Sequence, residues 1–398
     1  MSIVVQKYGG SSVSDVDKLK RIAQNIFAVK QQGYDMVVVV SAMGKNTNSL
    51  IEMAHSISAD PDKRELDMLL STGERTAMAL LSIALNEIGV KTISLTGSQS
   101  GIITNDRHND ATVIEVRPFR VQDELAKGKV VVIGGFQGVS YKRDITTLGR
   151  GGSDTSAVAL AAALNAERCE IYSDVDGIYT ADPNLIKDAK HLPEISYQQI
   201  QEMAEAGAKV LNAQAVQFAK NAKIAIYARS TFHSTRETVV RELTPEDKPD
   251  VIAVVYEEDM IRIIMNQEYP DLNGIVKILE LNNISVKELN YLKDDKFEVN
   301  KLSFVISVKN IYNWGKIKRE LLVKFDKDIS IDESLSAVSL IGQGFSSDNR
   351  ILIETISLFN RSNIQFHGLT TTSFRLSLLL KKEFMKQSVE LLHHHWIK

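Results

Sequence analysis

The chain has 398 residues, of which 44% are hydrophobic and 24% are charged, and its formal net charge is −3 at pH 7. This length and hydrophobic content are ample for a large buried core and predict two or three domains. The weak net charge gives no electrostatic reason to expect nucleic acid or an anionic membrane as a partner.

The sequence carries no sign of export or membrane insertion. No basic segment followed by a long apolar run stands near Met1, so a signal peptide is not expected. The longest apolar runs, such as residues 36–40, are far too short to span a bilayer. Cys169 is the single cysteine, which excludes an intrachain disulfide framework and a cysteine zinc cluster. We therefore expect a cytoplasmic protein with no membrane partner and no nucleic-acid partner.

Short apolar runs alternate with helical patterns from the first residue to about residue 230. The runs are apolar throughout, as are strands of a parallel sheet that is covered on both faces. Between the first two runs, apolar residues recur at helical spacing from Val16 to Phe27, and Gly33 is a helix stop signal. The pattern predicts βαβ units. Strands are expected at residues 3–5, 36–40, 130–133, 169–172 and 224–227, and a helix-rich stretch at 198–222.

The chain changes character after residue 235. Residues 236–250 are charged, contain two prolines and are expected to be a linker. From residue 251 the expected order is strand, helix, strand, strand, helix, and it then repeats, which indicates ferredoxin-like modules of roughly 75 residues. The expected boundaries are 1–235 for the first domain, 236–250 for the linker, 251–335 for the first module and 336–398 for the second.

Two glycine-rich turns indicate where the backbone approaches a charged ligand. Gly9 and Gly10 follow the first strand, and Gly151 and Gly152 precede an alanine-rich helical pattern. Neither turn is a Walker A motif or a dinucleotide fingerprint, because G-x-x-x-x-G-K-[ST] and G-x-G-x-x-G do not occur in the chain. Each turn leads into a helix, whose free N–H groups and positive dipole end favour an anion.

Charged side chains flank both turns. Lys7 precedes the first glycine pair, so its ammonium would face the same ligand as the turn. Arg150 precedes the second pair, and arginine holds a carboxylate with two parallel hydrogen bonds. Asp154 would orient a lysine that bears on a phosphoryl group. On these residues alone, a tight βα turn with a solvated Lys7, and a helix cap formed by Ser153 and Asp154, stay open as alternatives.

Six motifs occur in an order and spacing that resemble one family. They are KYGGSSV, VVVVSAMGKNTNSL, STGE, ITTLGRGGSDTSAVALAAAL, YSDVDGIYTADP and GAKVL, and all lie within residues 4–211. Together they resemble aspartate kinase, a member of the amino-acid kinase fold, and the C-terminal repeat resembles that family's paired ACT domains. The resemblance implies an α/β protein, with an amino-acid kinase fold (a parallel-rich central sheet flanked by helices) followed by two ferredoxin-like βαββαβ ACT modules.

The resemblance also implies an activity. The γ-phosphoryl group of ATP, bound with Mg²⁺, would pass to the side-chain carboxylate of L-aspartate, and the product would open the synthesis of lysine, threonine and methionine. Because the nucleophile is already an anion at pH 7, the reaction needs no general base and instead needs cations and amides that bring two anions together. A homodimer or larger homo-oligomer, formed through the ACT modules, is implied as well.

Site residues follow from the matching motif positions. Lys7 and Asp154 would be catalytic, with Asp154 organising the lysine, while Glu74 would meet the substrate ammonium and Arg150 its α-carboxylate. The full substrate set would be Ser41, Thr47, Glu74, Arg150, Gly151, Gly152 and Ser153. The nucleotide would be enclosed by Lys7, Tyr8, Gly9, Gly10, Ser173, Asp174, Tyr179, Asp182, Lys209 and Val210. An effector would contact Asp271 and Asn290 of the first ACT module, and no dedicated metal ligands are expected.

The chain departs from the family pattern near the nucleotide and in the regulatory half. Asn184 stands where arginine is usual, and residues 212–214 replace a common histidine-proline-arginine. In the strand expected to contact an effector, Leu289 replaces a side chain able to form hydrogen bonds, and Lys287 introduces a charge. These changes lead us to expect altered or lost feedback inhibition by lysine or threonine, and retuned nucleotide binding.

Two other functions stay open on the sequence. A kinase of another small carboxylate, such as glutamate or N-acetylglutamate, would share the fold, although an N-acetylated substrate has no ammonium for Glu74 to meet. A non-catalytic amino-acid sensor would keep the ACT modules, yet Lys7, Arg150 and Asp154 are all present. The consecutive histidines 393–395 do not indicate a metal site, because consecutive helix positions cannot all face one ion.

Overall fold

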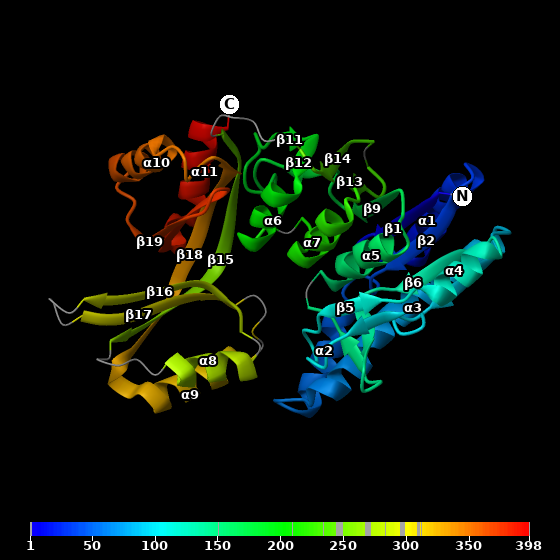
Figure 1. The fold of residues 1–398 in the computed structure, drawn as a ribbon, viewed down its shortest axis with the longest axis horizontal. Coiled ribbons are helices and arrows are strands. Elements are labelled where there is room, and N and C mark those ends of the chain that lie inside the picture. The colour runs from blue at the N-terminus through cyan, green and yellow to red at the C-terminus, as the bar shows by residue number, and fades with distance from the viewer. Residues whose placement is uncertain are drawn as a thin grey trace. The chain divides into compact units, whose positions relative to one another are not determined.

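The computed structural model describes residues 2–149, 151–208, 210–233, 235–243, 250–266, 272–282, 284–294, 299–308, 311 and 313–397. It divides the chain into two compact units (Figure 1). The first unit comprises residues 1–179, 190–204 and 209–245, and the second comprises 180–189, 205–208 and 246–398. Among the described residues, no helix is long and apolar enough to cross a membrane.

The first unit is built on an eight-stranded sheet in the order β12-β14-β13-β9-β1-β2-β6-β3. All its neighbouring strands run parallel except β13 and β14. The central strands are rich in valine and fully buried, as expected for a sheet covered on both faces. Their bounds are β1 Ile3–Tyr8, β2 Asp35–Val40, β3 Thr92–Leu95, β6 Val130–Gly134, β9 Arg168–Ser173, β12 Glu194–Ser196, β13 Ile226–Ser230 and β14 Glu237–Arg241.

Helices cover the sheet. In α1, Asp15 caps the first turn by accepting from the N–H of Lys18, and Leu19, Ile22 and Ile26 form the buried stripe. The helix α5 is buried almost all round, which explains its alanine-rich sequence. The helices of this unit are α1 Val16–Gln31, α2 Asn46–Ile57, α3 Lys63–Glu87, α4 Phe119–Ala126, α5 Gly152–Ala163, α6 Tyr197–Glu205 and α7 Ala213–Ala222.

Two smaller sheets complete the first unit. One has the order β5-β4-β7-β8, and the other pairs β10 with β11. Each of their strands has only two to four residues. Strands this short cannot be recognised in a sequence from their hydrophobic periodicity. Their bounds are β4 Ile102–Thr104, β5 Val113–Val116, β7 Gln137–Ser140, β8 Ile145–Thr147, β10 Ile178–Tyr179 and β11 His191–Leu192.

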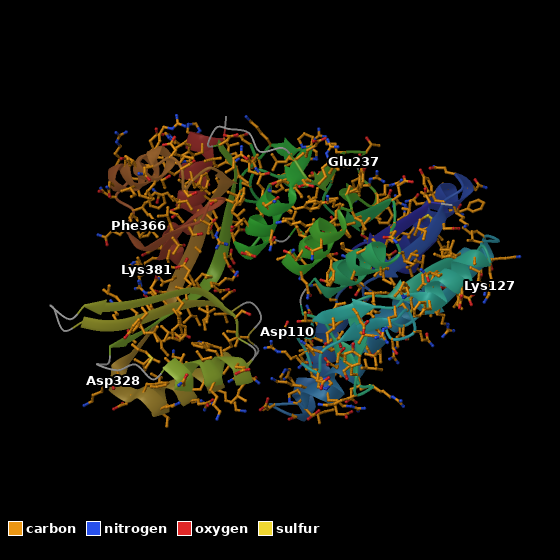
Figure 2. The ribbon with its side chains drawn as sticks, in the orientation of Figure 1. Asp110, Lys127, Glu237, Asp328, Phe366 and Lys381 are labelled. Carbon is orange, nitrogen blue, oxygen red and sulfur yellow. The ribbon has the colours of Figure 1, made fainter. Side chains whose placement is uncertain are left out.

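The second unit contains one six-stranded antiparallel sheet in the order β16-β17-β15-β18-β20-β19. Helices pack on it, and Figure 2 labels Phe366 of β19, whose ring lies 6.3 Å from that of Phe359 in α10. The elements are β15 Asp250–Asn266, α8 Leu272–Leu281, β16 Val286–Asp294, β17 Val299–Ser307, α9 Trp314–Phe325, β18 Ile329–Gln343, α10 Arg350–Arg361, β19 Phe366–Thr371, β20 Arg375–Lys381 and α11 Met385–Trp396.

The order of elements confirms the predicted repeat, and the strand lengths explain how each βαββαβ module is completed. Residues 260–265 of β15 pair with 329–335 of β18, whereas residues 250–257 of β15 pair with 337–343 of β18. Each long strand therefore supplies the last strand of the other module. The predicted boundary at residues 335–336 falls inside β18 for this reason.

The predicted linker, residues 236–250, is not irregular throughout. Strand β14 occupies Glu237–Arg241 and pairs with β13 and β12. Thr238 and Val240 are fully buried while their neighbours are more exposed, a two-residue alternation that the surrounding charges and prolines obscured. Residues 244–249 lie outside the described residues.

Candidate active site

Lys7 and Asp154 form a nearly buried ion pair at the carboxyl end of the central sheet. Lys7 lies near the end of β1, and Asp154 lies in the first turn of α5. Lys7 Nζ is 2.6 Å from Asp154 Oδ1, and the two side chains are only 11% and 12% exposed. The structure therefore brings the two residues predicted to be catalytic together and holds an ammonium at this edge of the sheet.

The turn after β1 presents backbone N–H groups. The N–H of Ser12 closes the turn on the carbonyl of Gly9 at 2.9 Å, and Lys18 of α1 donates to the carbonyl of Ser11 at 3.0 Å. Within the described part of the chain, no acceptor faces the N–H groups of Gly10 and Ser11. Adjacent backbone N–H groups without an acceptor are able to bind an anion.

Gly10 lies directly against the loop that follows β2. A Cβ atom at Gly10 would stand 2.9 Å from the carbonyl oxygen of Ala42, closer than side chains tolerate. The N–H of Gly44 donates to the carbonyl of Gly10 at 3.0 Å, and the N–H of Ser41 donates to that of Tyr8 at 3.1 Å. The structure thus places Ser41 beside the first glycine turn.

Glu74 of α3 is a buried carboxylate with one oxygen unused. Its exposed fraction is 3%, and Oε1 accepts from the N–H of Ala42 at 3.1 Å. Oε2 has no hydrogen-bond partner among the described residues. Burial raises the pKa of Glu74 to about 7. Thr47 is half-buried in the first turn of α2, a helix that packs on α3.

The second glycine turn lies between β8 and α5. Gly151 has φ +75°, a left-handed conformation that favours glycine, and a Cβ atom at Gly152 would meet Leu148 Cβ at 2.6 Å. Ser153 is 7% exposed and packs on Gly135, which follows β6. Arg150 lies outside the described residues. The turn therefore sits beside the carboxyl ends of the same parallel strands as the first.

A buried network that sequence reasoning missed holds the strand before Arg150. Asp67 of α3 is fully buried and accepts hydrogen bonds from the Thr147 hydroxyl, from the N–H of Asn109 at 3.1 Å, and from His108 Nδ1 at 2.7 Å. Thr147 is the last residue of β8. Burial raises the pKa of Asp67, although these hydrogen bonds oppose that effect.

The loop around His108 also touches the second turn directly. A Cβ atom at Gly149 would stand 2.5 Å from Asp110 Oδ1, and the N–H of Ala111 donates to the carbonyl of Thr147 at 3.0 Å. Asp110 is labelled in Figure 2. Asp67 and the 105–111 loop thus fix the position of the residues between β8 and Arg150.

A second missed network joins three central strands. Glu170 of β9 is 1% exposed and bonds to Gln6 of β1 at 2.8 Å, to Arg168 at 2.7 Å and to Arg229 of β13 at 2.8 Å. Burial alone would raise the pKa of Glu170, but the two guanidinium groups outweigh it and lower that pKa. The pairing fixes the strands whose carboxyl ends carry Lys7 and Ser173.

The predicted nucleotide residues after β9 lie in a turn stabilised by its own side chains. The N–H of Val175 donates to Ser173 Oγ at 3.1 Å, and the Tyr179 hydroxyl donates to Asp176 Oδ1 at 2.5 Å. Asp174 is exposed and has no partner in the described part of the chain. Asp174 is therefore the carboxylate of this turn that is free to meet a ligand.

Tyr8 is part of the core. Its ring is fully buried and stacks on Tyr172 with a centroid distance of 4.8 Å, and its hydroxyl donates to Gln6 at 3.1 Å. Any contact of Tyr8 with a nucleotide would therefore come from its main chain.

Asp182 belongs to the second unit and has partners at both carboxylate oxygens. The N–H of Asn184 donates to Oδ1 at 2.9 Å, and the Tyr256 hydroxyl donates to Oδ2 at 3.2 Å. Asn184 itself is exposed. Lys209 lies outside the described residues, and Val210 is half-buried.

Asn212, one of the departures from the family pattern, has a structural role. Its Oδ1 caps α7 by accepting from the N–H of Gln214 at 2.8 Å, and it accepts from the Thr155 hydroxyl of α5 at 3.2 Å. A Cβ atom at Gly151 would stand 2.9 Å from Asn212 Cβ. Asn212 therefore joins the start of α7 to the second glycine turn.

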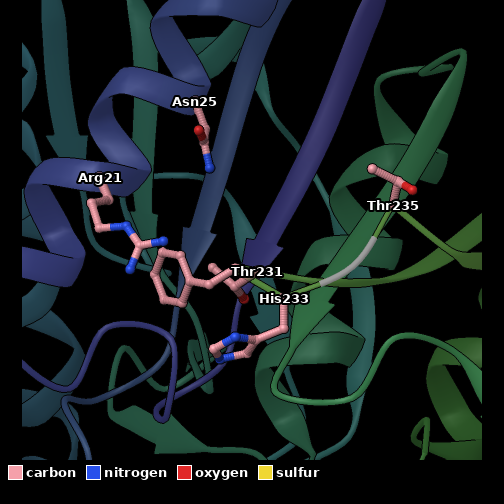
Figure 3. Close-up of a pocket in the computed structure, with 6 residues that line it drawn as sticks. Arg21, Asn25, Thr231, His233 and Thr235 are labelled. Carbon is pink, nitrogen blue, oxygen red and sulfur yellow. The ribbon is translucent and has the colours of Figure 1, made fainter.

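A cavity of about 640 Å³ lies between α1 and the loop after β13 (Figure 3). The guanidinium group of Arg21 stacks on Phe232 at 4.1 Å from the ring centroid. Thr231 at the cavity wall lies 2.6 Å from the Ser12 hydroxyl and donates to the carbonyl of Ser173 at 3.0 Å. Thr231 thus joins the first glycine turn to the end of β9.

Of the predicted effector residues, Asn290 lies on the edge strand β16 and is exposed. Its neighbour Leu289 is 62% exposed. Asp271 lies outside the described residues.

Comparisons with known proteins agree with this arrangement. The family model of the amino acid kinase family matches residues 2–230. The chain is similar to the aspartokinase of Bacillus sp. (strain MGA3), with 38% identity over 99% of this chain and 97% of that one. It is also similar to aspartokinase 2 of Bacillus subtilis, with 37% identity over the same shares of the two chains.

Solved structures match along the whole chain. E. coli aspartokinase III in complex with aspartate and ADP has a TM-score of 0.87 and 24% identity, with 100% of both chains covered, and supports the fold. The aspartate kinase from Synechocystis is 32% identical with a TM-score of 0.56, and the match covers 99% of this chain and 69% of that one.

Proposed function

We propose a mechanism for this chain, which belongs to the amino acid kinase family and, within it, to the aspartokinases. The enzyme transfers the γ-phosphoryl group of ATP to the side-chain carboxylate of L-aspartate and forms 4-phospho-L-aspartate. One observation carries the mechanism: the Lys7–Asp154 pair, 2.6 Å apart, lies beside Gly9, where a Cβ atom would stand 3.6 Å from Lys7 Nζ, and Gly10 and Ser11 follow with free N–H groups.

Lys7 and the first glycine turn bind the phosphoryl group in transit. The ammonium and the two N–H groups oppose the charge that spreads over the phosphoryl oxygens, and such pre-positioned donors are worth most where charge develops in the transition state. Asp154 fixes the direction of the ammonium. No side chain has to remove a proton, because the attacking carboxylate is already ionised at pH 7.

Glu74 and Arg150 orient the accepting aspartate. The unused Oε2 of Glu74 lies in a site that is buried but incomplete, which suits the ammonium of an amino acid. Arg150 would hold the α-carboxylate with two hydrogen bonds. Ser41, Thr47 and the turn at Gly151–Ser153 would line the remaining surface. This arrangement leaves the side-chain carboxylate of aspartate directed toward the phosphoryl group.

Mg²⁺ would arrive with the nucleotide. Among the described residues, no group of three or more potential metal ligands gathers. We propose that phosphate oxygens would carry most of the ion's coordination, with at most one or two carboxylates such as Asp174. When bound, the ion neutralises charge on the transferring phosphate.

ATP would be enclosed by Ser173, Asp174 and Tyr179, together with Lys209 and Val210. The capping role of Asn212 supports retained rather than lost nucleotide binding, because the substitution still fixes the start of α7. Asn184 offers no cation there, so a lower affinity for ATP is expected than with an arginine.

The second unit would assemble the enzyme as a homodimer or larger homo-oligomer in the cytoplasm. Edge strand β16 carries apolar side chains that are half exposed or more, namely Leu289, Tyr291 and Leu292. A partner that covers this strand would remove the exposed edge and its apolar surface from water.

Steady-state assays of ADP release test the reaction. The purified chain should release ADP with ATP, Mg²⁺ and L-aspartate, and not with L-glutamate or N-acetylglutamate. Chelation of Mg²⁺ should abolish release. Release with glutamate but not aspartate would assign the enzyme to another carboxylate kinase, and no release with any substrate would favour an amino-acid sensor.

A further inference from the structure

The side chain of Lys287 contacts the segment 205–208, which precedes the predicted nucleotide-binding residues Lys209 and Val210. It lies near the start of β16, and its ammonium donates to the carbonyl of Glu205, the last residue of α6. The same ammonium lies 3.2 Å from Glu257 Oε2 of β15. Lys287 therefore connects three segments within the second unit.

Loss of the Lys287 ammonium would leave the buried carboxylate of Glu257 without its cation. The Glu257 side chain is 9% exposed, and its other oxygen accepts from the Ser307 hydroxyl of β17 at 2.5 Å. A buried carboxylate without its cation carries an uncompensated charge. Lys287 is thus the cation that completes a polar cluster across β15, β16 and β17.

The segment 205–208 packs so closely against this cluster that a side chain at Gly207 would clash with it. Gly207 has φ +107°, and a Cβ atom there would stand 2.8 Å from both Glu257 Cβ and the carbonyl oxygen of Tyr256. Arg375 of β20 lies 3.9 Å from the Glu205 carboxylate. Close packing, a hydrogen bond and an ion pair therefore hold the segment on the sheet of the second unit.

We propose that Lys287 is a positioning residue for nucleotide binding, acting through the segment 205–208. The segment leads directly into Lys209 and Val210, and this inference rests on their proposed role in enclosing ATP. Anchored at Glu205 and Gly207, the segment 205–208 is held in one conformation directly before these positions. Released, it samples several, and the nucleotide must select the competent one, which weakens apparent affinity by the fraction populated.

In this proposal Lys287 itself positions the segment 205–208, and no regulatory ligand is needed. The Lys287 ammonium already has two partners within the protein, the Glu205 carbonyl and the Glu257 carboxylate. Its charge in β16 therefore has an intramolecular role. The prediction is a change in the KM for ATP that leaves the aspartate site alone.

Steady-state kinetics of full-length variants tests the proposal. Lys287→Met should raise the KM for ATP roughly threefold to tenfold, the size expected for the net contribution of one typical hydrogen bond. The kcat and the KM for aspartate should stay within about twofold. Lys287→Arg should restore most of the affinity. Lys277→Met, an exposed lysine of α8 in the same module, is the matched control and should leave every constant unchanged.

A double-mutant cycle separates positioning from loss of fold. Because Lys287 and Glu257 act as a pair, Lys287→Met combined with Glu257→Gln should raise the KM for ATP less than the product of the single effects. A KM for ATP unchanged in Lys287→Met, in a wild-type enzyme that turns over aspartate, would overturn the proposal. A wild-type enzyme without turnover would instead refute the proposed function.

Discussion

The ammonium of Lys7 lies 2.6 Å from the carboxylate of Asp154, although the two residues are far apart in sequence. The pair joins β1, which leads into the first glycine turn, to α5, which follows the second. An ammonium fixed in this way needs no rearrangement when charge develops on the phosphoryl oxygens.

Removal of this ammonium should therefore act on kcat. Lys7→Ala is expected to lower kcat by about a hundredfold or more while the fold and the KM for aspartate stay close to wild type. Asp154→Asn should have a smaller effect, because the lysine is retained but less well directed. Circular dichroism and steady-state kinetics check both variants. Substantial residual activity in Lys7→Ala would mean that the role of the lysine is misassigned.

The raised pKa of Glu74 predicts a pH dependence for aspartate. Only the ionised carboxylate attracts the substrate ammonium, so kcat/KM for aspartate should rise with pH and level off near the free-enzyme pKa of about 7. Glu74→Gln should lower kcat/KM by roughly tenfold or more and remove this dependence. If the variant kept the wild-type pH profile, the titrating group would lie elsewhere.

Ionisation of Glu74 should lower the free energy of unfolding as pH rises, whereas it raises kcat/KM for aspartate. Folded Glu74 keeps its proton up to about pH 7, whereas the unfolded residue loses it near 4.5. The folded state therefore binds more protons between these values, and its stability falls as pH rises through that range. Glu74→Gln should flatten this part of the curve in thermal melts made without substrate.

The Asp67 network predicts a selective loss of substrate affinity. Thr147 bonds to Oδ1 of Asp67 and His108 bonds to Oδ2. In Asp67→Asn an amide group replaces one of these two acceptors, so the side chain loses one of the two bonds and the chain before Arg150 should be less well fixed. We expect the KM for aspartate to rise roughly threefold to thirtyfold, with a much smaller change in the KM for ATP. Asp123→Asn, an exposed aspartate of α4, is the control. Equal changes in both KM values would point to general destabilisation.

Feedback inhibition should be weak or absent. Leu289 offers no hydrogen bond to an amino-acid effector, and the Lys287 ammonium is already engaged with Glu257 and the Glu205 carbonyl. Lysine and threonine, added singly and together at millimolar concentrations, should leave the initial rate within about twofold. Clear inhibition by either at sub-millimolar levels would contradict this prediction.

Local patterns predicted the parts of the structure that depend on near neighbours in sequence. Valine-rich runs identified β1, β2 and β6, and the glycines at 9–10 and 151–152 marked the turns where loops cross closely. The repeat of strands and helices after residue 250 predicted both modules, because its order is readable without knowledge of contacts.

The networks behind the site were not predictable in this way. Asp67 meets Thr147 and His108 across long stretches of chain, and a polar residue on a helix gives no sign of such partners. The full length of β15 was hidden as well, since Glu257, Glu258 and Asp259 interrupt its apolar pattern although the strand continues through them. Tertiary contacts decided these features.

Trapping of the product tests the central claim most directly. Hydroxylamine converts acyl phosphates to coloured hydroxamates, so ATP, Mg²⁺ and L-aspartate with the wild-type chain should yield aspartyl hydroxamate. Lys7→Ala should yield almost none under the same conditions. Hydroxamate formed equally by Lys7→Ala, or formed from glutamate or N-acetylglutamate but not from aspartate, would contradict the account.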